Sequence, residues 1–382
     1  MRRIAQILGV TLVILAALAL WKRDEIGRLQ AVLGMFKPDQ IVQNFSHMDK
    51  AFLTRDIPAS GPALSLPQGP AMPAIDGLAA WQAARSVTAM VVLHNGALVA
   101  EDYRLGTDPM DRRISWSVAK SYLSALFGIV LAEGMIVDIN DPVTKYVPSL
   151  TGTAYDGATV RDVLTMQSGV RFNEDYLDFW SDINKMGRVL ALGQSMDGFA
   201  AGISERGTPG VQWQYVSIDT HVIGMVIRGA TGRGIVDLMG EKLLQPLGLE
   251  AGGYYVTDGL GEPFVLGGLN FITRDYARMG QLFLQRGRIG DRQIVPADWV
   301  DASTSRQANT LADETGYGYQ WWVPDGAEDG EFLARGIYGQ YIYVNRASDV
   351  VIAVNAADIG FRKVGSYEST VAMFRKIAAA YQ

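Results

Sequence analysis

The chain has 382 residues, 48% of them hydrophobic and 19% charged, with 42 glycines and 14 prolines. This size and composition predict a globular, loop-rich protein of one large domain or two interleaved ones, and they exclude a disordered chain. The formal net charge is −6 and the basic residues form no block, which argues against nucleic acid as a partner.

The residues that commonly bind metals are scarce. Cysteine is absent, which rules out disulfides, thiolate catalysis and cysteine-based metal sites. The three histidines, His47, His94 and His221, show no metal-ligand spacing. We therefore expect no metal centre, and we expect no cofactor.

The first predicted element is an apolar N-terminal segment. Arg2 and Arg3 precede an apolar run over 4–21. A run of about eighteen residues is marginal for a bilayer span and also resembles a signal-peptide core. The small residues within 17–19 fit a cleavage pattern, whereas cleavage there would leave an awkward mature start. We expect residues 1–23 to be a signal anchor or a signal peptide, and we favour the anchor.

This segment determines the expected location. A signal anchor predicts a protein held in the cell envelope through its N-terminal segment, with an exported periplasmic or extracellular catalytic domain. A cleaved signal predicts secretion instead. A buried helix of a soluble protein is the third interpretation of the same residues.

A stalk and a folded body are predicted next. Residues 24–75 carry mixed short patterns and end in a Pro/Gly-rich stretch, which indicates a stalk and lead-in. The folded body is expected over 76–382. It begins with a β-hairpin in which Asn95-Gly96 forms a type I′ turn between two short apolar strands.

The rest of the body is predicted as a helical middle between strands. Helical patterns dominate about 142–285, and strand patterns return afterwards, before a final helix over about 367–380. Strands at both ends imply one sheet assembled from N- and C-terminal segments, with a helical domain inserted. The later strands are expected over 318–323, 338–345 and 350–355.

The strongest chemical signal is a Ser-x-x-Lys motif, Ser117 and Lys120, at the start of an apolar helix. Positions i and i+3 lie on one helical face, so the two side chains can meet locally. A serine hydroxyl needs a nearby base to act as a nucleophile. Lysine can be that base when burial or a neighbouring charge lowers its pKa, and the apolar surroundings favour such burial.

A Tyr-x-Ser motif, Tyr215 and Ser217, stands before a predicted helix. It could place a phenol and a hydroxyl beside Ser117. Next to a protonated lysine the phenolate becomes accessible, so Tyr215 could transfer protons. The alternative is that Tyr215 only packs in the helical domain.

A third signal is the glycine-containing strand entry around Gly336 and Ile337. Glycine lets a backbone approach a substrate closely, and a strand-edge N–H can serve an oxyanion hole. The natural pair of donors is the Ser117 N–H, at a helix N-terminus, and the Ile337 N–H. An ordinary glycine-rich strand entry is the alternative.

Together these motifs resemble the β-lactamase-related serine hydrolases, the group that includes class C β-lactamases, D,D-peptidases and esterases. The resemblance covers roughly 76–382, and within the family it is strongest to a branch that hydrolyses a linear amide dimer. It implies an α/β sandwich with a mainly antiparallel sheet flanked by helices and an inserted all-helical domain. The blocks that carry it, in order, are 117–120, 141–143, 164–170, 174–176, 215–217, 246–249, 267–269 and 336–340.

The resemblance implies catalytic roles for three residues. Ser117 would be the acylated nucleophile and Lys120 its proton acceptor. Tyr215 would be the second base and acid, which delivers a proton to the leaving group and later activates water.

The resemblance also implies four residues at the substrate site. Tyr176 matches a position that contacts the substrate amide in the amide-hydrolysing branch. Ser217 would orient Lys120, Asn270 would line the pocket, and Gly336 would lie along the substrate.

Two departures from the family pattern matter for the substrate. The third motif, usually Lys-Thr-Gly, is Ala334-Arg335-Gly336 here, and the tyrosine motif ends in Ser217 in place of asparagine. The cation that meets the β-lactam carboxylate is absent unless Arg335 substitutes for it from another direction. Both departures favour ester or linear amide substrates.

We therefore predict an exported serine hydrolase that cleaves small ester or amide substrates through an acyl-enzyme. The alternatives are a D,D-peptidase or weak β-lactamase acting on cell-wall peptides, and a non-catalytic receptor that becomes acylated. The oligomeric state is not predicted.

Overall fold

The computed structural model describes residues 2–311 and 313–382. Its main layer is a seven-stranded sheet in which all neighbouring strands are antiparallel. The sheet order is β3 (Ala97–Tyr103), β2 (Val87–His94), β13 (Val350–Ala356), β12 (Gln340–Asn345), β11 (Glu331–Gly336), β10 (Trp322–Val323) and β9 (Gly316–Tyr317).

Strands from both ends of the chain meet in this sheet, as the sequence predicted. β2 pairs with β13, with His94 opposite Val350. The predicted hairpin turn is confirmed, because Asn95 and Gly96 both have positive φ, 52° and 76°, as a type I′ turn requires.

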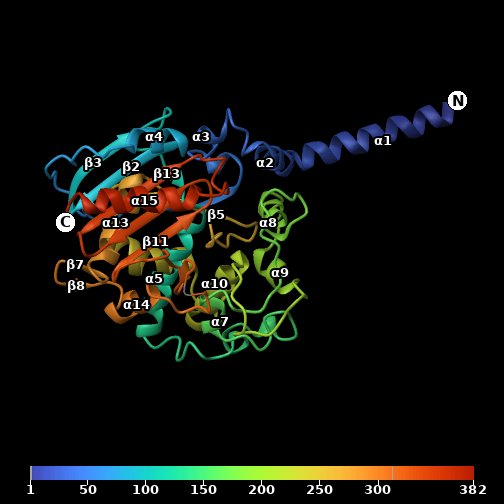
Figure 1. The fold of residues 1–382 in the computed structure, drawn as a ribbon. Helices are drawn as coiled ribbons and strands as arrows, with labels where there is room; N and C mark the ends of the chain where they lie inside the picture. Colours follow the sequence, from blue (N-terminus) through green and yellow to red (C-terminus); the bar gives the residue numbers. More distant parts are fainter. Residues whose placement is uncertain (1, 312) are drawn as a thin grey trace.

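Helices cover both faces of the sheet (Figure 1). One face packs on α4 (Leu78–Ala84) and α15 (Ser366–Ala379), and the other on α13 (Thr273–Leu284) and α5 (Ala119–Ala132). Alternate strand residues divide between the two layers: Val91 belongs to the core that contains α5, and Val92 to the core that contains α15. This period of two is the strand geometry. The predicted α/β sandwich is confirmed.

The helical insertion is shorter than the 142–285 predicted. Two buried strands, β5 (Gly253–Thr257) and β6 (Leu269–Phe271), lie within that range, and α13 packs on the main sheet. A short strand that is fully buried lacks alternation, so periodicity alone could not separate it from a helix. The helical part contains α6 (Val143–Tyr146), α7 (Val160–Leu164), α8 (Asp182–Ala191), α9 (Met196–Ala201), α10 (Ser217–Thr231), α11 (Ile235–Met239) and α12 (Gln245–Leu247).

The remaining described elements are short. A hairpin of β7 (Arg288–Ile289) and β8 (Arg292–Gln293) precedes α14 (Ala297–Ser303), which packs on α5. The single strand expected over 318–323 is instead the pair β9 and β10, joined by a turn in which Gln320 has a φ of 66°.

The expected stalk over 24–75 is corrected by the structure, because much of it belongs to the folded body. It contains α2 (Arg23–Gly34), α3 (Ile41–Asn44) and β1 (Leu53–Ile57). β1 pairs with β5 in a second sheet of order β1-β5-β6-β4, whose last strand is β4 (Arg113–Ile114). The side chains of Met35, Ile41, Phe45 and Met48 are buried in the main core.

The first helix, α1 (Arg2–Trp21), points away from the body (Figure 1). Large apolar side chains are exposed around it, including Ile7, Val13 and Trp21 at 66%, 69% and 74%. Among the described residues, no single helix is long and apolar enough to cross a membrane. The helical segments Gln6–Leu18 and Arg23–Gly34 are together long and apolar enough, but the chain bends by 72° between them.

Candidate active site

Ser117 lies in a short 3₁₀ turn, Trp116–Val118, that leads directly into α5. Trp116 has a φ of 42°, in the left-handed region that bulky residues avoid. Such a conformation costs about 1–3 kcal/mol and persists only when the surroundings enforce it. The turn exposes the Ser117 side chain to two cavities that meet beside it.

Lys120 is buried, as the apolar surroundings of the motif led us to expect. Its side chain is 1% exposed, and Nζ donates a hydrogen bond to the Leu266 carbonyl oxygen at 2.8 Å. Burial lowers the pKa of Lys120 to about 7, against the opposing charges of Glu174 and Asp219. A lysine with that pKa has a large neutral fraction near neutral pH, which a proton acceptor needs.

Tyr215 lies on the loop before α10, as predicted, with Lys120 Nζ 5.6 Å from the centre of its ring. Burial, and then the charge of Glu174, raise the pKa of Tyr215, while contact with Ser117 and the charge of Arg335 oppose that rise. The expectation of an accessible phenolate is therefore corrected. The phenol stays protonated at neutral pH and can act first as a proton donor.

Glu174 was quoted in a family block but given no role, and the structure brings it into the centre of the site. Its Oε1 accepts a hydrogen bond from the Ser217 N–H at 2.5 Å, and its Oε2 accepts one from the Tyr176 hydroxyl at 2.9 Å. Burial raises the pKa of Glu174, and the charge of Lys120 opposes that rise. The signal available in the sequence was its place two residues before Tyr176.

Asp219 is a second buried carboxyl that the sequence analysis missed. It is 0% exposed, and its Oδ1 accepts hydrogen bonds from the Tyr155 hydroxyl at 2.8 Å and the Ser168 hydroxyl at 2.9 Å. Burial raises the pKa of Asp219 to about 8. Its position in the first turn of α10 looks like ordinary helix-start chemistry in the sequence.

The two proposed oxyanion donors lie where β11 meets the nucleophile turn. A Cβ atom added at Gly336 would lie 2.6 Å from the Ser115 carbonyl oxygen and 3.1 Å from the Ser117 nitrogen. This close backbone approach requires glycine. Among the described residues, neither the Ser117 N–H nor the Ile337 N–H donates to another group. Two unpaired backbone amides at such a junction could stabilise an oxyanion if both point to the same place.

Aromatic residues of the N-terminal segment pack against the residues next to both amides. Tyr338, the residue after Ile337, has a φ of 59° and stacks on Phe36 with ring centres 4.9 Å apart. Phe45 packs edge-on against Tyr338 at 5.4 Å and against Trp116 at 5.6 Å. The two left-handed residues that flank the oxyanion donors are thus packed against residues far away in the chain.

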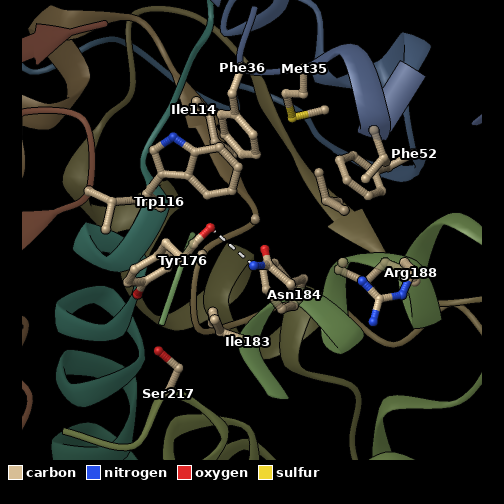
Figure 2. Close-up of a pocket in the computed structure, with 18 of the residues that line it drawn as sticks. Met35, Phe36, Phe52, Ile114, Trp116, Tyr176, Ile183, Asn184, Arg188 and Ser217 are labelled. Atoms are coloured by element: carbon tan, nitrogen blue, oxygen red, sulfur yellow. Dashed lines mark hydrogen bonds between the residues drawn. The ribbon is translucent and has the colours of Figure 1, made fainter. Parts of the chain in front are cut away.

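Two cavities meet at Ser117, Tyr176 and Ile337, which line both. The first has a volume of about 290 Å³ and is largely apolar (Figure 2). The second, of about 250 Å³, also has a mostly apolar surface, but charged side chains line it: Glu174, Arg335 and Arg362, beside Tyr215 and Trp322. We call them the apolar cavity and, for its charged lining, the polar cavity.

Arg335 supplies the cation that the third motif seemed to lack. It lines the polar cavity, with its guanidinium 4.1 Å from the ring centre of Tyr367 and 5.6 Å from that of Trp322. Trp322 in turn stacks on Tyr215 with ring centres 5.3 Å apart. The positive charge therefore lies on the same side of Ser117 as the tyrosine.

The structure places only some of the predicted substrate-binding residues at the cavities. Tyr176 and Gly336 lie at the cavities, as expected. Ser217 lines the apolar cavity, but no hydrogen bond from it to Lys120 is found among the described residues. Asn270 lies outside both cavities, fully buried in β6, and its Nδ2 donates to the Gly268 carbonyl oxygen at 2.9 Å. Gly267 and Gly268 line the apolar cavity in its place.

His221 takes no part in this site. Its Nε2 lies 2.7 Å from an oxygen of Asp197, which also pairs with Arg228 at 2.7 Å. Within 2–311 and 313–382, no cluster of three or more histidine and acidic residues is arranged to hold a metal ion.

The fold and the Ser-x-x-Lys site define a serine hydrolase with a β-lactamase/transpeptidase-like architecture. The Beta-lactamase family model matches residues 72–360, and the chain belongs to that family. It is 34% identical over 279 residues to a 6-aminohexanoate-dimer hydrolase of Paenarthrobacter ureafaciens, an alignment that covers 69% of this chain and 71% of the relative.

Solved structures agree on the fold. A Bacillus anthracis protein named as a candidate 6-aminohexanoate-dimer hydrolase superposes with a TM-score of 0.81 at 23% identity, covering 90% of this chain and 95% of that one. EstCE1, described as a hydrolase with promiscuous acyltransferase activity, superposes with a TM-score of 0.59 at 14% identity, covering 80% and 98%. The two superpositions show that this chain shares the fold of both proteins.

Proposed function

We propose that this protein hydrolyses carboxylic esters or linear amides through an acyl-enzyme on Ser117. The observation that carries the proposal is that Ser117 precedes, by three residues at the start of α5, a buried lysine with a lowered pKa, while its own N–H and that of Ile337 are unpaired where β11 approaches the turn. A nucleophile, a base and an oxyanion hole are the parts that acyl transfer needs.

Acylation follows from this geometry. Ser117 Oγ attacks the substrate carbonyl carbon while its proton passes to neutral Lys120. The carbonyl oxygen becomes an oxyanion held by the Ser117 and Ile337 amides. As the tetrahedral intermediate collapses, Tyr215 donates its proton to the leaving alcohol or amine, and protonated Lys120 restores it. Water then attacks the acyl-enzyme, its proton returns through the same residues, and Ser117 is released with the carboxylic acid.

The support for linear substrates comes from a relative. The Paenarthrobacter relative is named for a 6-aminohexanoate dimer, a substrate joined by an amide bond. A D,D-peptidase would instead form a long-lived adduct with penicillin, visible in the intact mass.

The first test is the intact mass of the full chain after treatment with a fluorophosphonate, beside the Ser117→Ala variant. We expect a single adduct on the parent and none on the variant. A folded parent that stays unlabelled would contradict an activated serine, and equal labelling of both proteins would assign the nucleophile elsewhere.

Replacing the base gives a second test. The Lys120→Ala variant is expected to lose roughly 10²–10⁴-fold in kcat, the usual contribution of a general base. A loss below tenfold in a variant with the parent's melting temperature would remove Lys120 from this role.

We also propose that α1 anchors the protein in the cell envelope and that the catalytic domain is exported. The support is the exposure of large apolar side chains around α1 and the basic pair, Arg2 and Arg3, before them. An exposed apolar surface of this extent needs a cover, and a bilayer provides one.

A further inference from the structure

The walls of the apolar cavity offer a substrate little to bind with hydrogen bonds. Asn184 is one of its few polar side chains, and its Nδ2 already donates to three backbone carbonyls, the closest that of Asp178 at 2.8 Å. Arg188 donates to the Phe179 carbonyl oxygen at 2.7 Å and packs on the Phe179 ring. Figure 2 shows Phe36, Phe52, Ile114 and Trp116 around the same space.

The position of the proton donor decides which part of the substrate enters this cavity. Tyr215 and Arg335 line the polar cavity and are absent from the described lining of the apolar one. A general acid must lie beside the leaving group that it protonates. The leaving group therefore occupies the polar cavity, and the acyl part extends into the apolar cavity.

We infer that the acyl group of the substrate is a hydrocarbon chain, drawn from a bilayer into the apolar cavity. This inference rests on the proposed hydrolase function and specifies its substrate class. An apolar pocket of about 290 Å³ whose lining is mostly hydrocarbon favours a hydrocarbon acyl group over a polar one.

The source of the chain follows from what forms the cavity's rim. Val32 and Leu33 of α2, and Met35 and Phe36 directly after it, line the cavity, and α2 continues from α1 (Figure 1). α2 is fastened to α8 by the hydrogen bond from Arg28 Nε to the Ala191 carbonyl oxygen at 3.0 Å. The segment proposed to enter the bilayer therefore leads directly to the wall of the acyl site.

Exposed apolar residues surround this opening. Leu33, Phe179 and Leu177 line the cavity while 59%, 48% and 87% exposed. Exposed apolar groups beside a pocket mark a surface that meets an apolar partner. Here that partner is the bilayer that supplies the acyl chain.

The test is a chain-length series with the full chain in detergent, using p-nitrophenyl acetate, butyrate and octanoate. Full burial of one methylene contributes about fourfold to kcat/KM. We expect kcat/KM to rise at least about tenfold from acetate to octanoate. Values that stay flat or fall with length would overturn the inference while leaving the hydrolase function intact. No hydrolysis of any ester and no fluorophosphonate adduct would overturn both.

A matched pair of variants locates the acyl site. Leu33→Glu adds a charge to the cavity wall, and Leu260→Glu makes the same change at a leucine that is 75% exposed and lines neither cavity. We expect Leu33→Glu to lower the octanoate-to-acetate ratio of kcat/KM by about fivefold or more, because an apolar chain bound at this wall would remove water from the new carboxylate. Leu260→Glu should keep the parent's ratio. Equal ratios in all three proteins would overturn the assignment of this cavity.

A third measurement distinguishes uptake of the acyl chain from the bilayer from uptake of the ester out of the surrounding water. The full chain is reconstituted into phosphatidylcholine vesicles, and p-nitrophenyl palmitate is placed either in the same vesicles or in a separate population. We expect hydrolysis to be at least about tenfold faster when enzyme and ester share a bilayer. Equal rates would overturn uptake from the bilayer.

Discussion

At the scale of single residues, the site depends on ionisable groups removed from water together. Lys120 and Asp219 are buried and Glu174 is partly so; the charges of both carboxyls raise the pKa of Lys120, and the charge of Lys120 opposes the rise in theirs. Burial favours the neutral form of every one of them. Lysine is thereby made available as a base, while the nearby carboxyls limit how far its pKa falls.

The acid side of the pH–rate profile should report Lys120. Only the neutral amine accepts a proton, so kcat/KM should fall as the pH drops below the lysine's pKa of about 7. Initial rates of p-nitrophenyl acetate hydrolysis between pH 5 and 9 measure this fall. On the acid limb of the profile, below the pKa, kcat/KM should drop roughly tenfold for each pH unit. A pH-independent rate down to pH 5 would contradict the assignment.

Glu174→Gln should move that limb to lower pH. The carboxylate raises the pKa of Lys120, so its removal lets the lysine lose its proton more easily. The glutamine carbonyl can still accept the hydrogen bond from the Ser217 N–H. Glu174→Asp keeps the charge and should keep the limb close to the parent's. A purely structural role for Glu174 would lower the rate of both variants without moving the limb.

At the scale of elements, the proposed oxyanion hole lies at a junction between a strand and a turn. β11 ends where it meets the 3₁₀ turn of Ser117, and Gly336 leaves no room for a side chain there. The two donors come from parts of the chain more than two hundred residues apart, so the hole forms only when the main sheet is complete.

Gly336→Ala should therefore impair catalysis more than folding. Its Cβ would collide with the Ser115 carbonyl oxygen and push β11 away from the turn, which removes the Ile337 donor. Loss of one oxyanion donor costs roughly 10²–10³-fold in kcat. Gly240→Ala, where an added Cβ meets nothing within 4 Å, is the control. Equal kcat values for both variants would contradict this account.

The local parts of the site could be predicted from the sequence. Ser117 and Lys120 lie at positions i and i+3 of one helix, and Asn95-Gly96 determines the hairpin turn. Neighbouring residues are therefore enough to predict both features. Glu174 and Asp219 could not be assigned, because their significance arises from burial beside Lys120, and burial depends on the whole fold. Strand β5 was missed for a related reason, since both of its faces are buried.

At the scale of the whole molecule, the N-terminal segment has two parts with different surroundings. Its first helix projects from the body, and the residues after it fill the core and the wall of the apolar cavity. The sequence did not predict this docking, because Met35, Ile41 and Phe45 follow no regular period and their partners lie far along the chain.

Truncation should separate these two parts. Removal of residues 1–21 takes away α1 and should leave the melting temperature of the body close to the parent's. Removal of residues 1–57 also removes β1 and at least four buried side chains, each worth roughly 1.5–3 kcal/mol against a typical total of about 5–15 kcal/mol. We expect that shorter form to be insoluble or unfolded by circular dichroism. A cooperative melt at the parent's temperature would contradict the docking.

Flotation with phosphatidylcholine vesicles tests the anchor. The full chain should float with the vesicles, and the form without residues 1–21 should remain at the bottom of the gradient. If both forms float, the exposed rim residues bind the bilayer by themselves. If neither does, α1 is not an anchor.

The packing of Phe36 and Phe45 against Trp116 and Tyr338 makes the enzyme's activity depend on its own assembly. Both left-handed residues beside the oxyanion donors rest on rings from the start of the chain. A polypeptide can therefore carry every reacting group and still be inert until the segment that contains Phe36 and Phe45 has docked on the body. Hydrolysis would begin only after that docking.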